Sequence, residues 1–183
     1  MADEHLYFED LVPGREWVSA ARVVAAADVA AFAALTGDRN PVHLDPAFAR
    51  STPFRRCVAH GLLGLALTGG MAWTTTPVRV VAFLGLREWH FRAPIYFGDA
   101  IRAKSRVLET ELQGRGRRGI VTWRVEVLNQ DGRLVQEGVT TMLVETARCG
   151  GRGWAAAGSS PRRRRADGPF IPVSQPLESG PLA

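Results

Sequence analysis

The sequence predicts an α+β fold in which a curved antiparallel sheet wraps around one apolar helix. Helix-type apolar spacing is confined to residues 25–73, whereas residues 78–146 are rich in Val, Thr, Trp and Arg and alternate in part, as strands do. Helices and strands therefore occupy separate parts of the chain. That order favours an α+β fold over the alternating order of a parallel βαβ fold.

The first expected elements are a strand, a helix and a sharp corner. Residues 15–24 suit a strand, and residues 25–36 carry apolar residues at helical spacing. Gly37 is expected to end this helix, because glycine readily adopts the left-handed conformation found at helix ends. Pro41 and Pro46 then prevent a long continuation, since proline lacks the amide hydrogen that a helix interior needs.

Residues 58–73 form the most apolar stretch of the chain and predict a central buried helix. The stretch has 16 residues and contains His60, so it is too short and too polar for a membrane span. Its glycines, at positions 61, 64, 69 and 70, weaken an isolated helix but permit close packing. We therefore expect no membrane partner.

A run of strands is predicted after this helix. The strands are expected at residues 78–92, 99–112, 118–130 and 133–146. The alternation is clearest in residues 120–127, and Asn129–Gly132 predicts a hairpin turn between the last two strands. Strands joined by short turns pair in antiparallel fashion.

The charge divides the chain into a domain at residues 1–147 and a tail at residues 148–183. The tail holds 6 Arg against 2 acidic residues, a net charge of +4, whereas residues 1–147 have a net charge of +1. A near-neutral body disfavours nucleic-acid binding, which normally concentrates basic charge on a folded surface. The Arg/Gly/Pro-rich tail is expected to be disordered. It is either a solvated extension or an electrostatic anchor for nucleic acid or acidic lipid.

The cysteines and the N-terminal segment favour a cytoplasmic protein. Cys57 and Cys149 are too few for a disulfide framework, which is typical of a reducing compartment. The first residues, MADEHLYFED, are acidic and polar, unlike a signal peptide.

Asp38 and His43 are the most informative pair of residues in the chain. They lie five residues apart, on either side of an Asn40-Pro41 corner that forces the chain to turn. A carboxylate and an imidazole that share one water can remove and return a proton near neutral pH. Alternatively, Asp38 and Asn40 are turn formers and His43 is a core histidine with satisfied hydrogen bonds.

Other site chemistries have weaker support. His43, Asp45 and His60 are possible metal ligands, but the chain has no HExxH motif, no cysteine pair and no carboxylate cluster, so we expect no metal. Cys57, three residues before His60, is a weak nucleophile signal, since buried inert cysteines are common. The glycines of residues 61–64 lack the GxGxxG spacing of a dinucleotide site.

His60 and Gly61 open the apolar helix and offer a place for negative charge. The first amides of a helix have no partner within the helix, and they lie at the positive end of its dipole. A thioester oxygen that gains charge during a reaction is stabilised by such a group. Alternatively, Gly61 only permits tight packing.

Three segments together resemble the MaoC-like dehydratases, which include the (R)-specific enoyl-CoA hydratases. The long and specific segment is FAALTGDRNPVH at residues 32–43. The supporting segments are VAHGLL at residues 58–63 and the stretch from Phe83 to Asp99. The resemblance covers about residues 5–146 and leaves out the tail.

The resemblance implies a hot-dog fold, an antiparallel sheet wrapped around a long helix, and at least a homodimer with its sheets joined edge to edge. By motif position, it implies that Asp38 and His43 are catalytic, that Asn40 supports them, and that the Gly61 backbone N–H holds the thioester oxygen. The implied reaction is reversible hydration of a trans-2-enoyl-CoA to a (R)-3-hydroxyacyl-CoA. It needs neither a metal nor a cofactor beyond the coenzyme A carried by the substrate.

Further residues are expected around the acyl-CoA thioester. Arg55, Arg56 and Arg92 are candidates for the coenzyme A phosphates, and the alternative for each is a solvated surface charge. His60 is a candidate substrate-binding residue. The small helix residues are expected to leave room for a long or branched acyl chain; they are Gly64, Thr68, Gly69 and Ala72.

Two other functions remain open on the sequence alone. A hot-dog thioesterase would release coenzyme A, which hydration does not. A non-catalytic acyl-CoA-binding module would keep the fold, but it need not retain both proton carriers. The acyl group itself is not determined by the sequence.

Overall fold

The computed structural model describes residues 5–114 and 116–147. The tail predicted for residues 148–183 lies outside the described residues, as does Cys149, so its disorder stays a prediction. Within the described part, no helix is long and apolar enough to cross a membrane.

The N-terminal part holds short elements that lead into a helical segment. They are η1 (Phe8–Asp10), β1 (Glu16–Val18), β2 (Arg22–Val23), α1 (Ala26–Thr36), α2 (Pro41–Leu44) and α3 (Pro46–Ser51). The strand predicted at residues 15–24 is interrupted, because the Ser19 hydroxyl takes the place of a backbone acceptor and receives the Ala103 N–H at 2.9 Å. As predicted, α1 ends at Gly37, which has φ 78° and donates its N–H to Ala33 O.

The apolar helix is α4 (Gly61–Thr75), three residues later at its start than the predicted stretch. It is buried on one face and exposed on the other, and both faces carry apolar side chains. Leu63, Gly64, Thr68 and Met71 are buried, whereas Leu62 and Trp73 are 61% and 53% exposed. The sequence predicted a central buried helix. One face of α4 packs in the protein, as predicted, and the other face is exposed.

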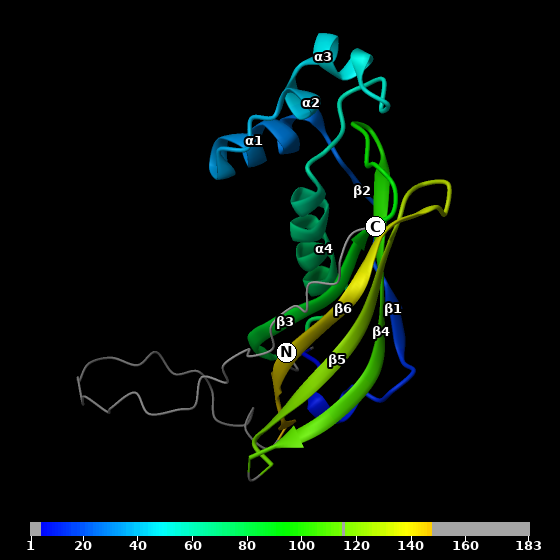
Figure 1. The fold of residues 1–183 in the computed structure, drawn as a ribbon. Coiled ribbons are helices and arrows are strands. Elements are labelled where there is room, and N and C mark those ends of the chain that lie inside the picture. Colours follow the sequence, from blue (N-terminus) through cyan, green and yellow to red (C-terminus); the bar gives the residue numbers. More distant parts are fainter. Residues whose placement is uncertain (1–4, 115, 148–183) are drawn as a thin grey trace, which may run out of the picture. The chain divides into compact units, whose positions relative to one another are not determined.

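The sheet is antiparallel and curves past α4 (Figure 1). Its long strands are β3 (Val80–Phe91), β4 (Ala100–Gln113), β5 (Arg118–Leu128) and β6 (Leu134–Glu145). The strand order is β1-β4-β5-β6-β3, and β2 also pairs with β4. A turn over residues 129–132 joins β5 to β6, with Gly132 at φ 74° as the hairpin prediction requires. The predicted α+β class and hot-dog arrangement are confirmed.

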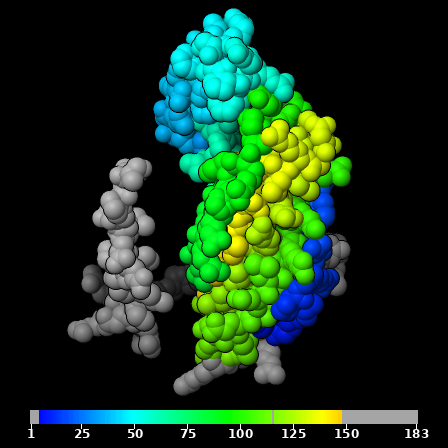
Figure 2. Space-filling model, turned by 45° about the vertical axis from the view of Figure 1, so that its right-hand side comes forward, coloured from blue at the N-terminus to red at the C-terminus, as the bar shows by residue number. Residues whose placement is uncertain are grey.

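Helices α1, α2 and α3 gather at one end of the sheet, close to the start of α4 (Figure 1). Figure 2 shows the same segment, in blue and cyan, as a cap above the green and yellow strands. An apolar cluster holds this helical segment against α4 and the sheet, since Val29 of α1, Leu63 of α4 and Ile101 of β4 belong to one buried group. This packing brings the residues of the Asn-Pro corner to the first turn of α4.

A buried carboxylate lies on β6. Glu137 is 7% exposed and accepts hydrogen bonds from Arg92 Nε, at 2.7 Å, and from Arg124 Nη2. The hydrogen bond from Arg92 lowers the pKa of Glu137 below its ordinary value, and the charge of Arg124 adds to this, whereas burial opposes it. Because both arginines are about half exposed, their charges stay partly hydrated.

We predict that Glu137→Gln lowers the free energy of unfolding at pH 7 by about 1.5–3 kcal/mol, the range for hydrogen bonds to charged groups. Since the folded-state pKa is below the ordinary value of 4.5, the contribution is complete above that pH and is lost as the pH falls below it. Urea unfolding at several pH values measures this, with Glu109→Gln on exposed β4 surface as the control. An equal loss of stability in both variants would contradict the prediction.

Candidate active site

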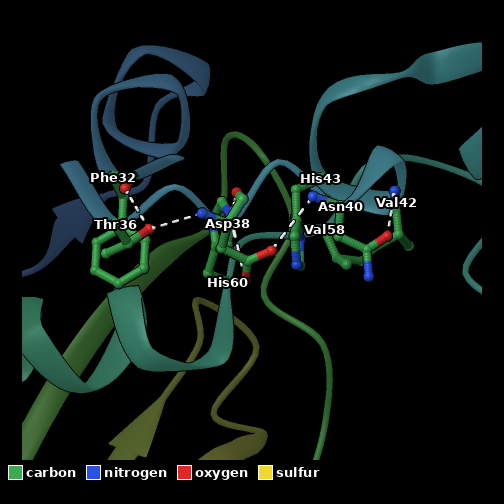
Figure 3. A network of polar contacts seen from close by, with 8 residues as sticks. All are labelled: Phe32, Thr36, Asp38, Asn40, Val42, His43, Val58 and His60. Carbon is green, nitrogen blue, oxygen red and sulfur yellow. Dashed lines mark hydrogen bonds and ion pairs between the residues drawn. The ribbon is translucent and has the colours of Figure 1, made fainter. Parts of the chain in front are cut away.

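The Asn-Pro corner positions two functional side chains through short-range hydrogen bonds (Figure 3). Asn40 Oδ1 accepts the Val42 N–H at 3.2 Å and so caps α2, whose first residue is Pro41. The Asn40 N–H in turn donates to Asp38 Oδ1 at 3.3 Å. Asn40 therefore fixes both the Asp38 carboxylate and the short helix that carries His43.

Asp38 lies just after the end of α1, where its carboxylate remains accessible. Its N–H donates to Thr36 Oγ1 at 3.3 Å, which holds the main chain as it leaves Gly37. The side chain is 52% exposed. One carboxylate oxygen accepts from Asn40, so the other is available to a water or a substrate.

His43 is oriented by its Nδ1 atom. Nδ1 lies 2.8 Å from the carbonyl oxygen of Val58, and because a carbonyl only accepts, Nδ1 carries a hydrogen there. Nε2 is then the ring atom available for proton exchange. Asp38, His43 and His60 each offer one polar atom, and these atoms all lie within 4.8 Å of one another. Asp38 and His43 are thus close enough for a single bridging water.

His60 lies behind this pair, at the position before α4. It is 2% exposed, and its Nε2 donates to the main-chain oxygen of Asp38 at 2.9 Å, with Asp38 Oδ2 at 3.9 Å. Its ring centroid is 3.8 Å from that of His43. His60 thus contacts both members of the pair (Figure 3), and its role in substrate binding stays a prediction.

An open cavity of about 390 Å³ adjoins these residues. His43, His60 and Gly61 line it, together with Phe91 and Gln136. As the first residue of α4, Gly61 has no acceptor for its N–H within the helix. The Phe91 ring lies so close that a Cβ at Gly61 would be 2.9 Å from it. The first turn of α4 therefore presents a backbone donor at the wall of a cavity that also contains His43.

A second, largely apolar cavity of about 480 Å³ runs along α4, beginning at Leu65. Thr68 lines it, but its hydroxyl is already bonded to Gly64 O at 2.8 Å. The space above Gly64 is filled, because a Cβ there would be 2.3 Å from Gln136 Nε2. Gly69 and Ala72 also line this cavity, and a Cβ at Gly69 would meet no atom within 4 Å. The room expected over the small helix residues is thus present at Gly69 and not at Gly64.

The three candidate arginines differ in their surroundings. Arg92 lines the first cavity and is held by Glu137. Arg56 lies with its guanidinium carbon 3.7 Å from the centroid of the Tyr96 ring, in a cation–π contact. Arg55 has φ 63° and donates to Arg50 O at 3.5 Å. Arg55 and Arg56 are exposed and come directly after Phe54, which lines the first cavity.

The residues considered for other chemistries have different surroundings in the structure. Asp45, one of the possible metal ligands, instead caps α3 by accepting the Ala47 N–H at 2.7 Å. Asp38 takes its place beside the two histidines, but His60 Nε2 is engaged by a main-chain oxygen. Cys57 is a buried free thiol.

Sequence reasoning missed Gln136, Phe91 and Trp89, each of which lines one of the two cavities. Gln136 gave little signal, since its neighbours in the strand are Val135 and Glu137, and its burial, at 2% exposed, is known only from the structure. Buried polar side chains form hydrogen bonds, so this burial implies a partner. Phe91 and Trp89 resembled ordinary strand residues.

Comparisons with known proteins bear on the family and the fold. A profile of the MaoC like domain matches residues 10–130. The (R)-specific enoyl-CoA hydratase of Aeromonas caviae is 40% identical over 113 residues, which cover 62% of this chain and 81% of that protein. The unliganded R-hydratase of Pseudomonas aeruginosa is 31% identical, with a TM-score of 0.65 over 78% of this chain and 87% of that one. A Mycobacterium tuberculosis protein with a double hot-dog fold, 22% identical with a TM-score of 0.68 over 78% of this chain and 45% of that one, shows the fold alone.

We predict that Gly64→Ala destabilises the protein although alanine is the better helix former. The helix preference favours alanine by about 1 kcal/mol. The new Cβ would lie 2.3 Å from Gln136 Nε2 and 2.9 Å from Ile95, and overpacking of this kind costs about 1–3 kcal/mol. The matched control is Gly70→Ala on the same helix, where a Cβ meets nothing within 4 Å and a gain in stability is expected. Thermal unfolding measures both, and equal shifts would refute the role of Gln136.

Proposed function

The chain belongs to the MaoC-like domain family, and on this premise we propose that it catalyses the reversible hydration of a trans-2-enoyl-CoA to a (R)-3-hydroxyacyl-CoA. The observation that carries the proposal is the common cavity of His43 and Gly61, with Asp38 beside it. Relatives named as hydratases support this class of reaction. A proton-handling pair and a donor for negative charge are the two groups that hydration of a thioester needs.

In the proposed reaction, Asp38 and His43 hold one water between them. The water oxygen forms a bond to C3 of the enoyl group while its proton passes to one member of the pair. The electrons of the C2–C3 double bond move toward the thioester, and its oxygen becomes an enolate. A proton from the pair then reaches C2, and the net change is the addition of one water.

Gly61 stabilises the enolate in this mechanism. Its N–H lies at the positive end of α4 and is free of any acceptor within the helix. A preorganised backbone donor of this kind is typically worth about 10²–10³ in rate. Because Gly61 has no side chain, the Phe91 ring can pack closely against the first turn of α4.

We propose that the reaction requires neither a redox cofactor nor a metal. Water addition transfers no electrons between substrate and protein, and the thioester itself accepts the developing charge. His43 Nδ1 and His60 Nε2 both donate to main-chain oxygens, which suits a water site better than a set of metal ligands.

The coenzyme A part of the substrate is proposed to lie toward the arginines at the first cavity. Arg92 is held by Glu137 at the lining of this cavity, and Arg55 and Arg56 follow Phe54 in its wall. Neither Arg55 nor Arg56 forms an ion pair with another described residue. Their charges are therefore available to the phosphates of coenzyme A.

A homodimer is proposed from the free edge of β3. Among the described strands, β3 pairs with β6 only, so its other edge carries unpaired backbone groups. Apolar side chains on this strand are exposed, including Phe83 at 54% and Leu84 at 49%. Pairing of two β3 edges about a two-fold axis would cover both features.

We predict that Asp38→Asn and His43→Gln each lower kcat for hydration of crotonyl-CoA by about 10²–10⁴-fold, the usual contribution of a general acid or base. Asp38→Asn keeps the shape of the side chain, and His43 is only partly buried, so folding should be retained. The matched control is Asp45→Asn, because asparagine caps α3 as well as aspartate does and Asp45 lies outside the pair. Loss of the enoyl thioester absorbance measures the reaction.

A free-thiol assay on the same samples separates hydration from thioester hydrolysis. Under the proposal, wild type consumes crotonyl-CoA without releasing coenzyme A. Stoichiometric thiol release would instead support a thioesterase. Full activity in the folded Asp38 and His43 variants would refute the proposed mechanism.

We predict that Leu84→Lys weakens self-association at least tenfold. A two-fold axis through β3 sets the two lysines near each other, and like charges that face each other across strands are destabilising. Leu112→Lys, at a 57% exposed position on β4, is the control and should leave the dimer intact. Sedimentation equilibrium measures the association, and a monomeric wild type would contradict the proposal.

A further inference from the structure

The two cavities along α4 are separated by two side chains that bond to each other. Gln136 lines the first cavity and Trp89 lines the second. Trp89 Nε1 donates to Gln136 Oε1 at 3.4 Å, and Gln136 Nε2 donates to Gly61 O at 3.0 Å. A continuous chain of contacts thus runs from the strand β3, through β6, to the first turn of α4.

Two glycines make room for this pair. A Cβ at Gly64 of α4 would lie 2.3 Å from Gln136 Nε2. A Cβ at Gly138 of β6 would lie 2.4 Å from the indole of Trp89. Both distances are well below contact distance, so neither side chain could hold its place if these positions carried larger residues.

A β-bulge turns Trp89 toward the interior. In the pairing of β3 with β6, Arg87 lies opposite Val139 and His90 lies opposite Glu137. Glu88 and Trp89 therefore share the single partner Gly138, and Glu88 adopts φ 50°, an unfavourable conformation for a residue other than glycine. Bulges of this kind re-aim a side chain, and here the re-aimed side chain is the indole between the cavities.

The space beyond the pair suits a hydrocarbon chain. The second cavity has about 480 Å³ and is lined mainly by apolar side chains from α4 and from the strands. On α4, Gly61 lines the first cavity, and Leu65, Thr68 and Ala72 follow along the helix in the second. An acyl chain that pointed away from the Gly61 N–H along α4 would meet Gln136 and Trp89 before it reached this space.

We propose that Gln136 and Trp89 form a partition that ends the acyl site, so that the protein selects short-chain enoyl thioesters of about crotonyl size. The proposal rests on the proposed hydratase function. Gln136 and Trp89 are specificity-determining residues in this scheme, since they limit chain length and take no part in proton transfer. Removal of the indole joins the two cavities and lets longer chains bind.

The expected effect is large because each buried methylene contributes about a fourfold gain in affinity when an apolar site receives it. In wild type, chain length beyond the partition brings no such gain. In Trp89→Ala, the ratio of kcat/KM for trans-2-dodecenoyl-CoA to that for crotonyl-CoA should rise at least about tenfold. Trp89→Phe keeps most of the ring volume and should retain the short-chain preference.

Two further variants test whether the second cavity receives the chain. Trp73→Ala removes an indole of equal size from another wall of that cavity, and it should leave the ratio unchanged. In the double variant Trp89→Ala/Gly69→Leu, the new leucine points into open space at Gly69 and should reverse the gain. If Trp89→Ala does not fold, Trp89→Leu serves as a smaller apolar replacement, with circular dichroism as the folding control.

Binding of unreactive butyl-CoA and dodecyl-CoA thioethers, measured by calorimetry, makes the test independent of turnover. A gain for dodecyl-CoA in folded Trp89→Ala and none in wild type supports the partition, even if no enoyl-CoA is hydrated and the proposed function fails. Equal preference for long chains in wild type and Trp89→Ala overturns the partition, whether or not crotonyl-CoA is hydrated.

Discussion

The hydrogen bond from His60 Nε2 to the main-chain oxygen of Asp38 is the interaction on which the site depends. It joins the loop after α1 to the residue that precedes α4, two segments that are 22 residues apart. The same imidazole lies against the ring of His43, whose Nδ1 is fixed by Val58. One buried side chain therefore sets the distance between the proton-handling pair and the Gly61 amide, which neither segment could set alone.

The sequence predicted the features of the fold that depend on residues close together in the chain. The end of α1 at Gly37, the turn before β6 and the corner at Asn40-Pro41 follow from backbone preferences and local hydrogen bonds. For the same reason Asp38 and His43 could be paired from their spacing, although spacing alone also allowed turn formers and a core histidine. The supporting role of Asn40 came from the family resemblance. The exposed face of α4 was missed because an apolar stretch looks alike whether it is covered by its own chain or left open at the surface.

The inner wall of the site could not be predicted, because it depends on register. Gln136 reaches Gly61 only since β6 pairs with β3 and β5 in one specific alignment, and a shift by one residue would turn it to the other face. Trp89 faces inward because of a β-bulge, and no local sequence pattern predicts that bulge. The positions of Gly64 and Gly138 are likewise explained only by the side chains packed over them.

Some parts of the site are held by local contacts and others by long-range contacts, and this difference affects how the protein tolerates amino-acid substitutions. The proposed proton-handling pair is held by caps and turns within a short stretch and by bonds to Val58 and His60, none of which lies in a long strand of the sheet. The partition depends on a bulge, two glycines and one strand register, and a single substitution at any of them alters the length of the site. Under the two proposals, chemistry and chain-length selection therefore depend on separable parts of one fold, with Gln136 bonded to Gly61 at the point where they meet.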